Sequence, residues 1–378
     1  MEKRRQKDAK YELAAICAGA LLAVFFLWWF FGGVKTQFEN MALGAETAPV
    51  YARIGKRVIH CKAVTDAKDC VENFRKNDGQ TAVLWLGNSQ LHGINQYRPG
   101  QHPAPWFLYK KLRKQNLDLV AFSEPNANLQ EHLVLFAFLK NKLPVKILLL
   151  PLIFDDLRED GIRAEIAPAL VEASTLASLE KYPIGKSILS RNADPTKGDL
   201  GALANTVQET VEKSIDKYLS AHSELWALRP QARGRLLQWL YVLRNTVLGI
   251  TPQSKRKMIP GRYRMNMEAI KAILEEAKSS GVKVLAYIAP IRNDVSMPYD
   301  KSQYDEFIAS ASELVENQGG VFVNLEGIVP AKNWGSKDAT TAGGKAEIDF
   351  MHFQEEGHRI LAHELEKQVL RMMNGMKP

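Results

Sequence analysis

Short apolar runs alternate with helical segments through most of the chain, and this alternation constrains the fold more than any other feature. The apolar runs are nearly continuous, as expected of parallel strands covered on both faces. They are Ala82–Leu86, Leu117–Phe122, Val145–Leu152, Val282–Ile288 and Val321–Asn324. The helical segments are Trp106–Gln115, Leu129–Lys140, Asn266–Ser279, Glu306–Asn317 and Gln354–Met372. The pattern predicts a three-layer α/β fold around a mostly parallel, five-stranded sheet.

Residues 13–34 form a stretch of 22 residues without a charge. As a helix rising about 1.5 Å per residue it would reach roughly 33 Å, enough to cross a hydrocarbon core about 30 Å thick. Basic residues precede it, which predicts a cytoplasmic N-terminus and an exported remainder. A cleaved signal peptide is the alternative, but its apolar core is usually about 7–15 residues long. We therefore expect a retained transmembrane anchor.

The expected organisation is a cytoplasmic tail over 1–12, the anchor over 13–34, a stalk over 35–78 and an α/β domain over 79–378. A helix-rich insertion at about 157–264 interrupts the alternation. Within it, the apolar stretch 236–243 has basic flanks. It either lies on a membrane or a membrane partner, or it packs against the core.

The cysteines agree with export. Cys17 lies in the apolar stretch, whereas Cys61 and Cys70 flank a short polar stretch on the exported side. An oxidising compartment permits a disulfide between them, which would stabilise the fold by roughly 2–3 kcal/mol. Two free thiols are the alternative, and a zinc site would need further ligands.

The net charge of +8 indicates an anionic partner such as a membrane surface or an acidic polymer. The basic residues are scattered and form no recognised nucleic-acid module, so we expect no nucleic-acid partner. The sequence also contains no Gly-rich phosphate loop and no cluster of metal ligands. We therefore expect neither cofactor nor metal.

Two short motifs carry chemistry. Gly87-Asn88-Ser89 follows an apolar run directly, and catalytic groups of open α/β sheets gather at the carboxyl ends of strands. A serine that caps the next helix is the alternative. Asp349-Phe350-Met351-His352 precedes the last helix, and its spacing lets the carboxylate reach one imidazole nitrogen while the other faces a serine hydroxyl. A helix start or a surface ion pair is the alternative there.

Together the two motifs resemble the SGNH (GDSL-like) hydrolase superfamily over roughly residues 79–378, with Gly-Asn-Ser in place of the usual Gly-Asp-Ser. The resemblance implies that Ser89 is the nucleophile, His352 the general base and Asp349 the orienting carboxylate.

The middle blocks of the family depart from its pattern. Asn126 stands nearest the family's oxyanion glycine, and asparagine tolerates the left-handed backbone. Asn128 resembles a helix N-cap, and either asparagine could instead donate its side-chain amide to an oxyanion. The third-block Gly-x-Asn-Asp is absent, which removes one expected donor and predicts a slower hydrolase. Gln90 and Arg292 complete the candidate oxyanion and substrate-binding residues.

An anchor joined to an exported domain of this type looks like the D-alanyl transfer protein of teichoic acid synthesis and like exported polysaccharide O-acetyltransferases. That likeness implies a bacterial inner-membrane location, with the catalytic domain on the periplasmic side. It also implies a multi-pass membrane-bound O-acyltransferase as partner and a polysaccharide hydroxyl as acceptor of an acyl, typically acetyl, group. A membrane-tethered carbohydrate esterase or deacetylase and an inactive adaptor in a membrane complex are the alternatives.

Overall fold

A computed structural model of the chain describes residues 50–62, 64–76, 81–93, 97–98, 100–192, 254–337 and 346–375, with residues 243, 246, 247 and 249. Nearly all of them belong to one compact unit, formed by residues 46–204, 251–338 and 345–378. The predicted tail and anchor, Cys17 and residues 236–242 of the apolar stretch lie outside the described residues, whereas Leu243, the last residue of that stretch, is described and exposed. Within the residues that are described, no helix has both the length and the apolar character needed to span a bilayer.

Six strands form the central sheet of this unit, in the order β3-β5-β4-β6-β7-β8, and every neighbouring pair is parallel. They are β3 (His60–Cys61), β4 (Thr81–Gly87), β5 (Leu117–Ser123), β6 (Val145–Leu152), β7 (Lys283–Ile288) and β8 (Val321–Asn324). The five longer strands coincide with the predicted runs. The predicted number of five was wrong, because β3 comes from the segment expected to be a stalk. A two-residue strand is too short to leave a periodic pattern in the sequence.

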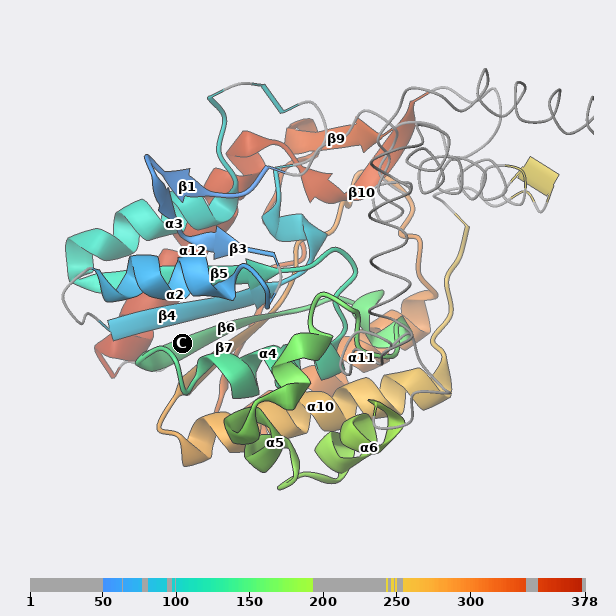
Figure 1. Cartoon of the computed structure of the whole chain (residues 1–378). Coiled ribbons are helices and arrows are strands. Elements are labelled where there is room, and N and C mark those ends of the chain that lie inside the picture. Colours follow the sequence, from blue (N-terminus) through green and yellow to red (C-terminus); the bar gives the residue numbers. More distant parts are fainter. Residues whose placement is uncertain are drawn as a thin grey trace, which may run out of the picture. The chain divides into compact units, whose positions relative to one another are not determined.

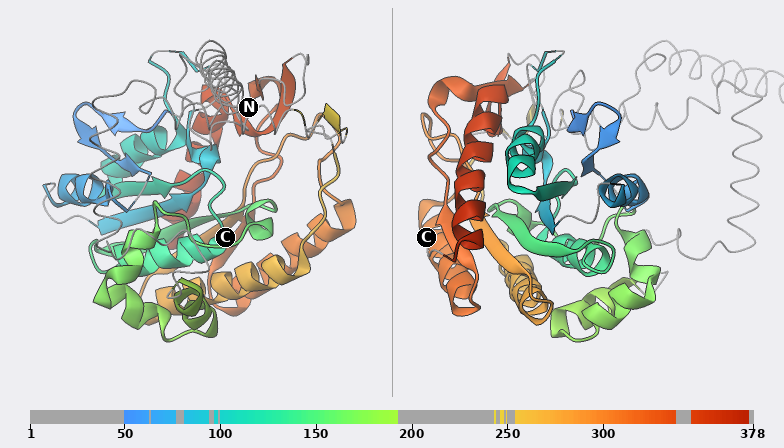
Figure 2. Two further views of the ribbon diagram at one scale, coloured as in Figure 1. Left: turned by 45° about the vertical axis from the view of Figure 1, so that its right-hand side comes forward. Right: turned by 90° about the vertical axis from the view of Figure 1, so that its left-hand side faces the viewer.

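Helices cover both faces of the sheet, which explains why the strands are apolar along nearly their whole length (Figure 1, Figure 2). One face packs against α3 (Ala104–Leu112) and α12 (Glu355–Met373). The opposite face packs against α2 (Ala67–Arg75), α4 (Leu129–Leu139), α10 (Pro260–Ser279) and α11 (Lys301–Asn317). The three predicted layers are therefore present.

The first part of the predicted insertion packs on this second helical layer. It contains α5 (Ala173–Leu179), which contacts α4, and α6 (Pro183–Asn192), which contacts α10. Buried apolar residues of both helices, such as Leu179 and Ile188, belong to the same core as the sheet face beneath. The insertion therefore thickens one side of the domain rather than forming a separate body over these residues.

The chain changes direction at β4. It crosses to β5 through α3 on one face, then returns through α4 on the other face to β6 on the far side of β4. In open α/β sheets, such a reversal leaves a crevice at the carboxyl ends of the two diverging strands, where ligands bind. The carboxyl ends of β4 and β6 are therefore the place to look for a functional site.

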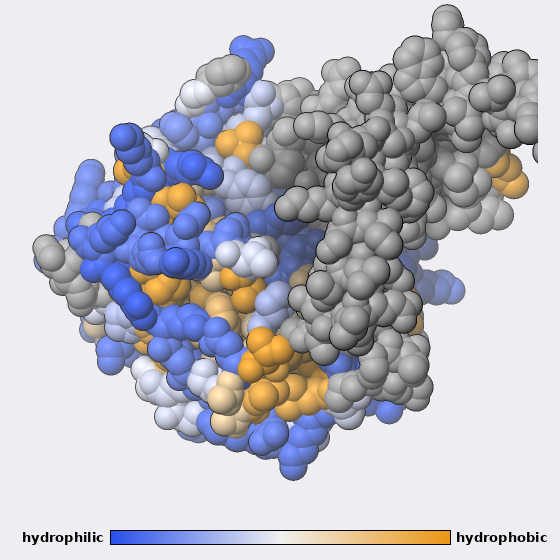
Figure 3. Space-filling view, in the orientation of Figure 1, coloured by the Kyte–Doolittle hydropathy of each residue, from blue (hydrophilic) through white to orange (hydrophobic). Residues whose placement is uncertain are grey.

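The surface of the described residues is largely polar. On the face that Figure 3 shows, hydrophilic side chains predominate and the apolar ones gather in small areas. Val171, the last residue of the 3₁₀ helix (Ala167–Val171) that precedes α5, is 58% exposed and is among the few large apolar side chains open to solvent in the described residues. Most apolar residues are used in the two cores on either side of the sheet.

Candidate active site

The turn after β4 presents Ser89 at the carboxyl end of the sheet. Ser89 opens a short 3₁₀ helix (Ser89–Leu91), and the side chain of Asn88 caps it by accepting the backbone N–H of Gln90 at 2.9 Å. The cap is therefore Asn88 and not the serine, contrary to the alternative that the sequence left open. Gly87 is needed because a Cβ there would lie 2.4 Å from the Leu91 side chain. The serine hydroxyl thereby stays available for chemistry.

His352 and Asp349 lie in β10 (Glu347–Phe353), which pairs antiparallel with β9 (Trp334–Lys337) and is irregular between Ile348 and Phe353. One Asp349 carboxylate oxygen accepts the backbone N–H groups of Met351 and His352 at 2.9 and 3.0 Å. The carboxylate thus folds back over its own chain. This local turn explains how a three-residue spacing can work within a strand segment.

The structure brings the three residues of the two motifs together. The Nε2 atom of His352 lies 3.0 Å from the Oγ of Ser89, and its Nδ1 lies 2.9 Å from the second oxygen of Asp349. Ser89 and His352 are 8% and 7% exposed, and Asp349 is 3% exposed. An imidazole held between a serine hydroxyl and a buried carboxylate is the geometry that activates a serine as nucleophile.

Electrostatics favour a charged aspartate at this position. Burial acts to raise the pKa of Asp349, but the adjacent His352 and the backbone N–H of Met351 outweigh it and hold the pKa below its usual range. Two further histidines near His352 behave differently. Burial is the main cause that lowers the pKa of His92 and of His358 to about 3, and the neighbouring His352 acts in the same direction. Both therefore stay neutral while His352 exchanges its proton.

Gln90 does not point to an oxyanion. Its side-chain amide donates to the backbone carbonyl of Pro290 at 2.8 Å and to that of Met351 at 2.9 Å. The expected substrate-binding role is replaced by a structural one, because the amide ties the Ser89 turn to β10. The relative position of nucleophile and base therefore depends on this side chain.

Arg292 is also engaged within the protein. Its guanidinium makes a two-point ion pair with Asp294 at 2.7 and 3.0 Å and donates to the Gly335 carbonyl at 3.2 Å. Its backbone N–H donates to Phe350, next to Asp349. These contacts engage Nε and both terminal nitrogens of the guanidinium. The structure therefore does not support the expectation that Arg292 binds an anionic substrate.

The turn after β5 carries Asn126 with φ +56°, in the left-handed conformation that the sequence predicted. The Ala127 N–H donates to the Glu124 carbonyl at 3.0 Å, so Pro125 and Asn126 form the corners of a tight turn. Gly87 of β4 is in register with Ser123 of β5, which brings this turn beside the Ser89 turn.

Hydrogen-bond donors of two residues, Ser89 and Asn126, remain available there. Among the described residues, neither the N–H of Ser89 nor the backbone and side-chain amides of Asn126 have a hydrogen-bond partner. Asn126 is exposed. Free N–H groups on adjacent strand ends are the arrangement that stabilises an oxyanion during acyl transfer.

Arg163 holds the Asn126 turn from outside, and no motif in the sequence pointed to this residue. Its guanidinium donates to the carbonyls of both Pro125 and Asn126 and pairs with buried Glu131 at 3.5 Å. Burial raises the pKa of Glu131 to about 7, against the charge of Arg163 and two backbone N–H groups that lower it. Arg163 belongs to the predicted insertion, which therefore supports the site.

Asn128 is the N-cap of α4, as one of the two sequence alternatives predicted. Its side chain accepts the N–H of Glu131 while the Glu131 carboxylate accepts the N–H of Asn128, which completes a capping box. Its amide nitrogen donates to the carbonyl of Gly161 at 2.9 Å. With both ends engaged, Asn128 is not an oxyanion donor.

Asp156 lies four residues beyond the end of β6, at the start of a short 3₁₀ helix (Asp156–Arg158), in the segment where the third-block asparagine is missing. It is 2% exposed, and the amide of Asn88 donates to both of its oxygens at 3.0 Å. Burial raises the pKa of Asp156 well above its ordinary value, and the Asn88 hydrogen bond opposes this only in part. An amide–carboxyl pair thus joins the ends of β4 and β6, the two diverging strands. Among the described residues no group of three metal ligands occurs.

The parallel sheet, the Gly-x-Ser turn after its first long strand and the Asp-x-x-His segment before α12 resemble the arrangement of SGNH/GDSL-like hydrolases. No protein-family model matches the sequence, and no curated protein matches it significantly. Two solved structures illustrate its distant similarities. One is a catalytic mutant of an acetylxylan esterase from Geobacillus stearothermophilus, with 8% identity and a TM-score of 0.35, covering 77% of this chain and 94% of that chain. The other is described as a GDSL-like lipase from Parabacteroides merdae, with 10% identity and a TM-score of 0.34, covering 76% and 94%.

Proposed function

We propose that this chain is a serine-dependent acyltransferase that moves an acyl group, through an acyl-Ser89 intermediate, to a hydroxyl of a polysaccharide. The observation that carries the proposal is the continuous contact from Ser89 through His352 to Asp349, with distances of 3.0 and 2.9 Å. The free N–H groups of Ser89 and Asn126 add the means to stabilise a tetrahedral oxyanion.

The first half-reaction loads the serine. The Oγ of Ser89 attacks the acyl carbonyl carbon as its proton passes to Nε2 of His352, and the carbonyl oxygen becomes an oxyanion facing the N–H donors. The bond from the acyl carbon to the donor oxygen then breaks. His352 returns its proton to that leaving oxygen, so the products are acyl-Ser89 and the free donor alcohol. Asp349 stabilises the imidazolium throughout.

The second half-reaction unloads the serine. A sugar hydroxyl replaces the donor alcohol, gives its proton to Nε2 of His352 and attacks the acyl carbon. When the second tetrahedral intermediate collapses, the Oγ of Ser89 leaves and takes the proton back from His352. A glycan ester and the free serine result, with no net proton release.

Transfer and hydrolysis use the same three side chains, and access of water decides between them. Ser89 and His352 are each less than a tenth exposed, which limits water at the acyl-enzyme and favours an acceptor that binds well. A carbohydrate esterase that uses water as acceptor is the second candidate. The loss of the third-block donor argues against it as a fast hydrolase.

The acyl donor and the location belong to the same proposal. We infer that a multi-pass membrane-bound O-acyltransferase supplies the acyl group and that the domain works on the periplasmic side of a bacterial inner membrane. The uncharged stretch 13–34 with basic residues before it supports the anchor, and the Cys61–Cys70 disulfide supports an oxidising compartment.

The experiment uses the full chain in a mild detergent with p-nitrophenyl acetate as donor and a series of oligosaccharides as acceptors. We expect a burst of p-nitrophenol, an acetyl group on Ser89 by mass spectrometry, and an acetylated glycan in larger yield than free acetate. Ser89→Ala abolishes all three, whereas Ser190→Ala, an exposed serine on α6, leaves them unchanged. Free acetate as the main product would favour the esterase. A Ser89→Ala chain as active as the wild type would leave only an adaptor role.

A further inference from the structure

A buried cluster outside the triad joins three segments of the site. The Oγ of Ser123, the last residue of β5, lies 2.5 Å from Nε2 of His60 and 2.7 Å from Nε2 of His92. His60 and His92 are 2% and 1% exposed, and Ser123 is fully buried. The ring of Tyr51 packs against both imidazoles, at 4.9 and 4.6 Å between centroids. None of these residues touches the acyl group in the proposed reaction.

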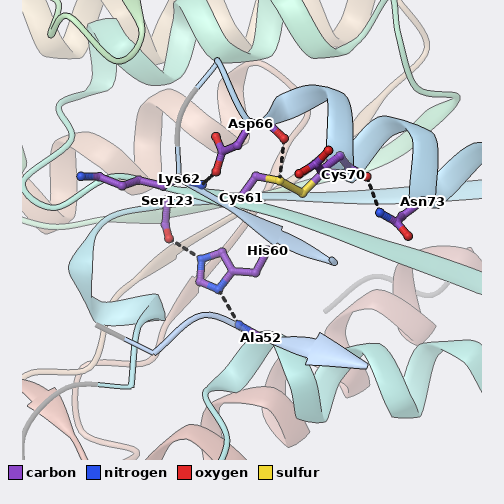
Figure 4. Close-up of a disulfide and its surroundings, with 9 residues drawn as sticks. Ala52, His60, Cys61, Lys62, Asp66, Cys70, Asn73 and Ser123 are labelled. Carbon is purple, nitrogen blue, oxygen red and sulfur yellow. Dashed lines mark hydrogen bonds between the residues drawn. A yellow bond between two sulfur atoms is a disulfide. The ribbon is translucent and has the colours of Figure 1, made fainter. Parts of the chain in front are cut away.

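The hydrogen atoms of this cluster can be placed by following the donors. The N–H of Ala52 points to Nδ1 of His60 at 3.4 Å, so Nδ1 accepts and Nε2 carries the proton (Figure 4). His60 then donates to the Ser123 hydroxyl. On the other side, Nε2 of His92 lies 2.7 Å from the same hydroxyl and 3.4 Å from the Ser123 carbonyl oxygen. Hydrogen bonds therefore link Ala52, His60, Ser123 and His92 in sequence.

Charge does not disturb this chain. Burial lowers the pKa of His60 well below its ordinary value, and lowers that of His92 to about 3 despite a hydrogen bond to Ser123 that raises it. Smaller contributions in the same direction come from His352 and Lys62 for His92, and from His92 and His358 for His60. Both imidazoles are neutral, so each keeps one donor and one acceptor nitrogen across the working range of pH.

Each member of the cluster is attached to a different part of the site. His92 donates its backbone N–H to the carbonyl of Ser89 at 3.0 Å, which closes the 3₁₀ turn of the nucleophile. Ser123 is the residue from which the Asn126 turn departs. His60 lies in β3, which pairs with β5 through His60 and Cys61.

A disulfide next to His60 fixes one end of this series of hydrogen bonds. Cys61, next to His60, forms the predicted disulfide with Cys70 of α2 (Figure 4). The Cys61 sulfur is thereby bonded to α2, and the adjacent His60 imidazole is held against Ser123 at the end of β5. This is a use for β3 that the sequence did not reveal.

We propose that His60 and His92 are positioning residues that hold the Ser123 hydroxyl, and through it fix the nucleophile turn and the Asn126 turn at the separation that acyl transfer requires. The proposal rests on the proposed function of the site. Small displacements of reacting groups are costly, since about 1 Å of misplacement can lower a rate about 10²-fold. The expected signature is therefore a loss in kcat with little change in KM.

The test compares Ser123→Ala, His60→Leu and His60→Gln in the full chain, with p-nitrophenyl acetate as substrate. We expect kcat to fall about 10- to 100-fold in Ser123→Ala and His60→Leu, with KM within about twofold of the wild type. His60→Gln keeps an N–H near the position of Nε2 and should recover most of kcat. His132→Leu is the matched control, because His132 is also fully buried but has no hydrogen-bond partner among the described residues.

A second measurement separates this proposal from the proposed function. Hydrogen exchange at the amides of residues 89–92 and 124–127 should be faster in His60→Leu and Ser123→Ala than in the wild type, and unchanged in His132→Leu. A wild-type chain without Ser89-dependent activity would overturn the function, and the exchange rates would still decide the role of the cluster. Unchanged exchange overturns the positioning role. Unchanged kcat in both variants of an active enzyme, or an equal loss in His60→Gln and His60→Leu, overturns it too.

Discussion

The Nε2 atom of His352 lies 3.0 Å from the Oγ of Ser89, although 263 positions separate the two residues in the chain. The carboxyl end of β4 presents the serine, and the irregular strand before α12 presents the histidine. The Gln90 amide, bound to the Met351 carbonyl, holds these two segments together. The contact is therefore a property of the fold and of one bridging side chain.

Asp349→Asn should lower kcat about 10⁴-fold while leaving the fold intact. The amide oxygen can still accept the N–H groups of Met351 and His352, so the local turn is kept. Its NH₂ group, however, faces Nδ1 of His352 and favours the tautomer whose Nε2 carries a proton and cannot accept one from Ser89. Steady-state kinetics with p-nitrophenyl acetate measure the loss.

Asp305→Asn is the control for this substitution, because Asp305 is an exposed carboxylate on α11 that pairs with Lys301. It should leave kcat within about twofold of the wild type. An Asp349→Asn enzyme with nearly full activity would show that the carboxylate is not needed to orient His352.

Asp156→Asn should retain activity to within a few-fold and lose a pH dependence of stability. Burial raises the pKa of Asp156, so the native state keeps a proton that the unfolded chain releases above about pH 4. The unfolded state then binds fewer protons than the native state, and the free energy of unfolding falls as pH rises. The amide introduced by Asp156→Asn does not titrate, so the variant should lose this decrease in the free energy of unfolding. Urea unfolding between pH 4 and 8 measures it.

Asp156→Leu provides the contrast, because it leaves the Asn88 amide buried without its acceptor. An unsatisfied buried donor costs about 1–3 kcal/mol, so this variant should be less stable than the wild type at every pH. If Asp156→Asn lost as much activity as Asp156→Leu, the site would require a carboxylate at this position. The assignment of a protonated, neutral Asp156 beside Asn88 would then be wrong.

Arg163→Lys should lower kcat about 10- to 100-fold with little change in KM. One ammonium cannot serve both the Pro125 and Asn126 carbonyls and the Glu131 carboxylate, which the guanidinium fork contacts together. The Asn126 turn would then lose its fixed position beside Ser89. Arg191→Lys is the matched control from the same insertion, since Arg191 of α6 pairs with Asp160 and donates to Gln130 but bonds to neither the Pro125 nor the Asn126 carbonyl. Equal kinetics in the two variants would contradict the role of Arg163.

His132→Leu should make the protein more resistant to mild acid. Burial, with a smaller contribution from the charge of Arg163, lowers the pKa of His132 to about 3, so the native imidazole stays neutral below pH 6.5 while the unfolded chain takes up a proton. The unfolded state binds more protons there, and stability is lost as pH falls from about 6.5 towards 3. One such group contributes about 1.4 kcal/mol per pH unit.

The slope of unfolding free energy between pH 4.5 and 6 measures this contribution in the full chain. His132→Leu should reduce the slope by about that amount, whereas His363→Leu, an exposed histidine on α12, should leave it unchanged. Identical slopes in wild type and His132→Leu would mean that His132 is protonated in the native state.

The sequence predicted the five long strands because each is a nearly continuous apolar run, and it placed helical segments between them. It also located Ser89, His352 and Asp349, which sit in motifs next to those elements. It missed β3 because two residues carry no period. The catalytic roles of Ser89, His352 and Asp349 stay predictions.

The supporting contacts left no signal in the sequence. Arg163 reaches the Asn126 turn from 37 positions away, and His60 reaches Ser123 from 63 positions away. Such pairs depend on which strands are neighbours, and the order of strands in a sheet does not follow from their pattern alone. For the same reason the role of Gln90 was predicted wrongly. Its side-chain amide was expected to bind substrate, but it donates to backbone carbonyls 200 and 261 positions along the chain.

The two-residue length of β3 has a consequence for self-association. β3 occupies the open side of β5 at only His60 and Cys61, and a strand so short offers a second molecule little free backbone to pair with. Further along β5, buried Asp118 binds Arg57 at 2.5 Å and lies 3.8 Å from Arg113. Buried charge at a sheet margin disfavours the docking of a foreign strand. This margin of the sheet is thereby protected from edge-to-edge aggregation.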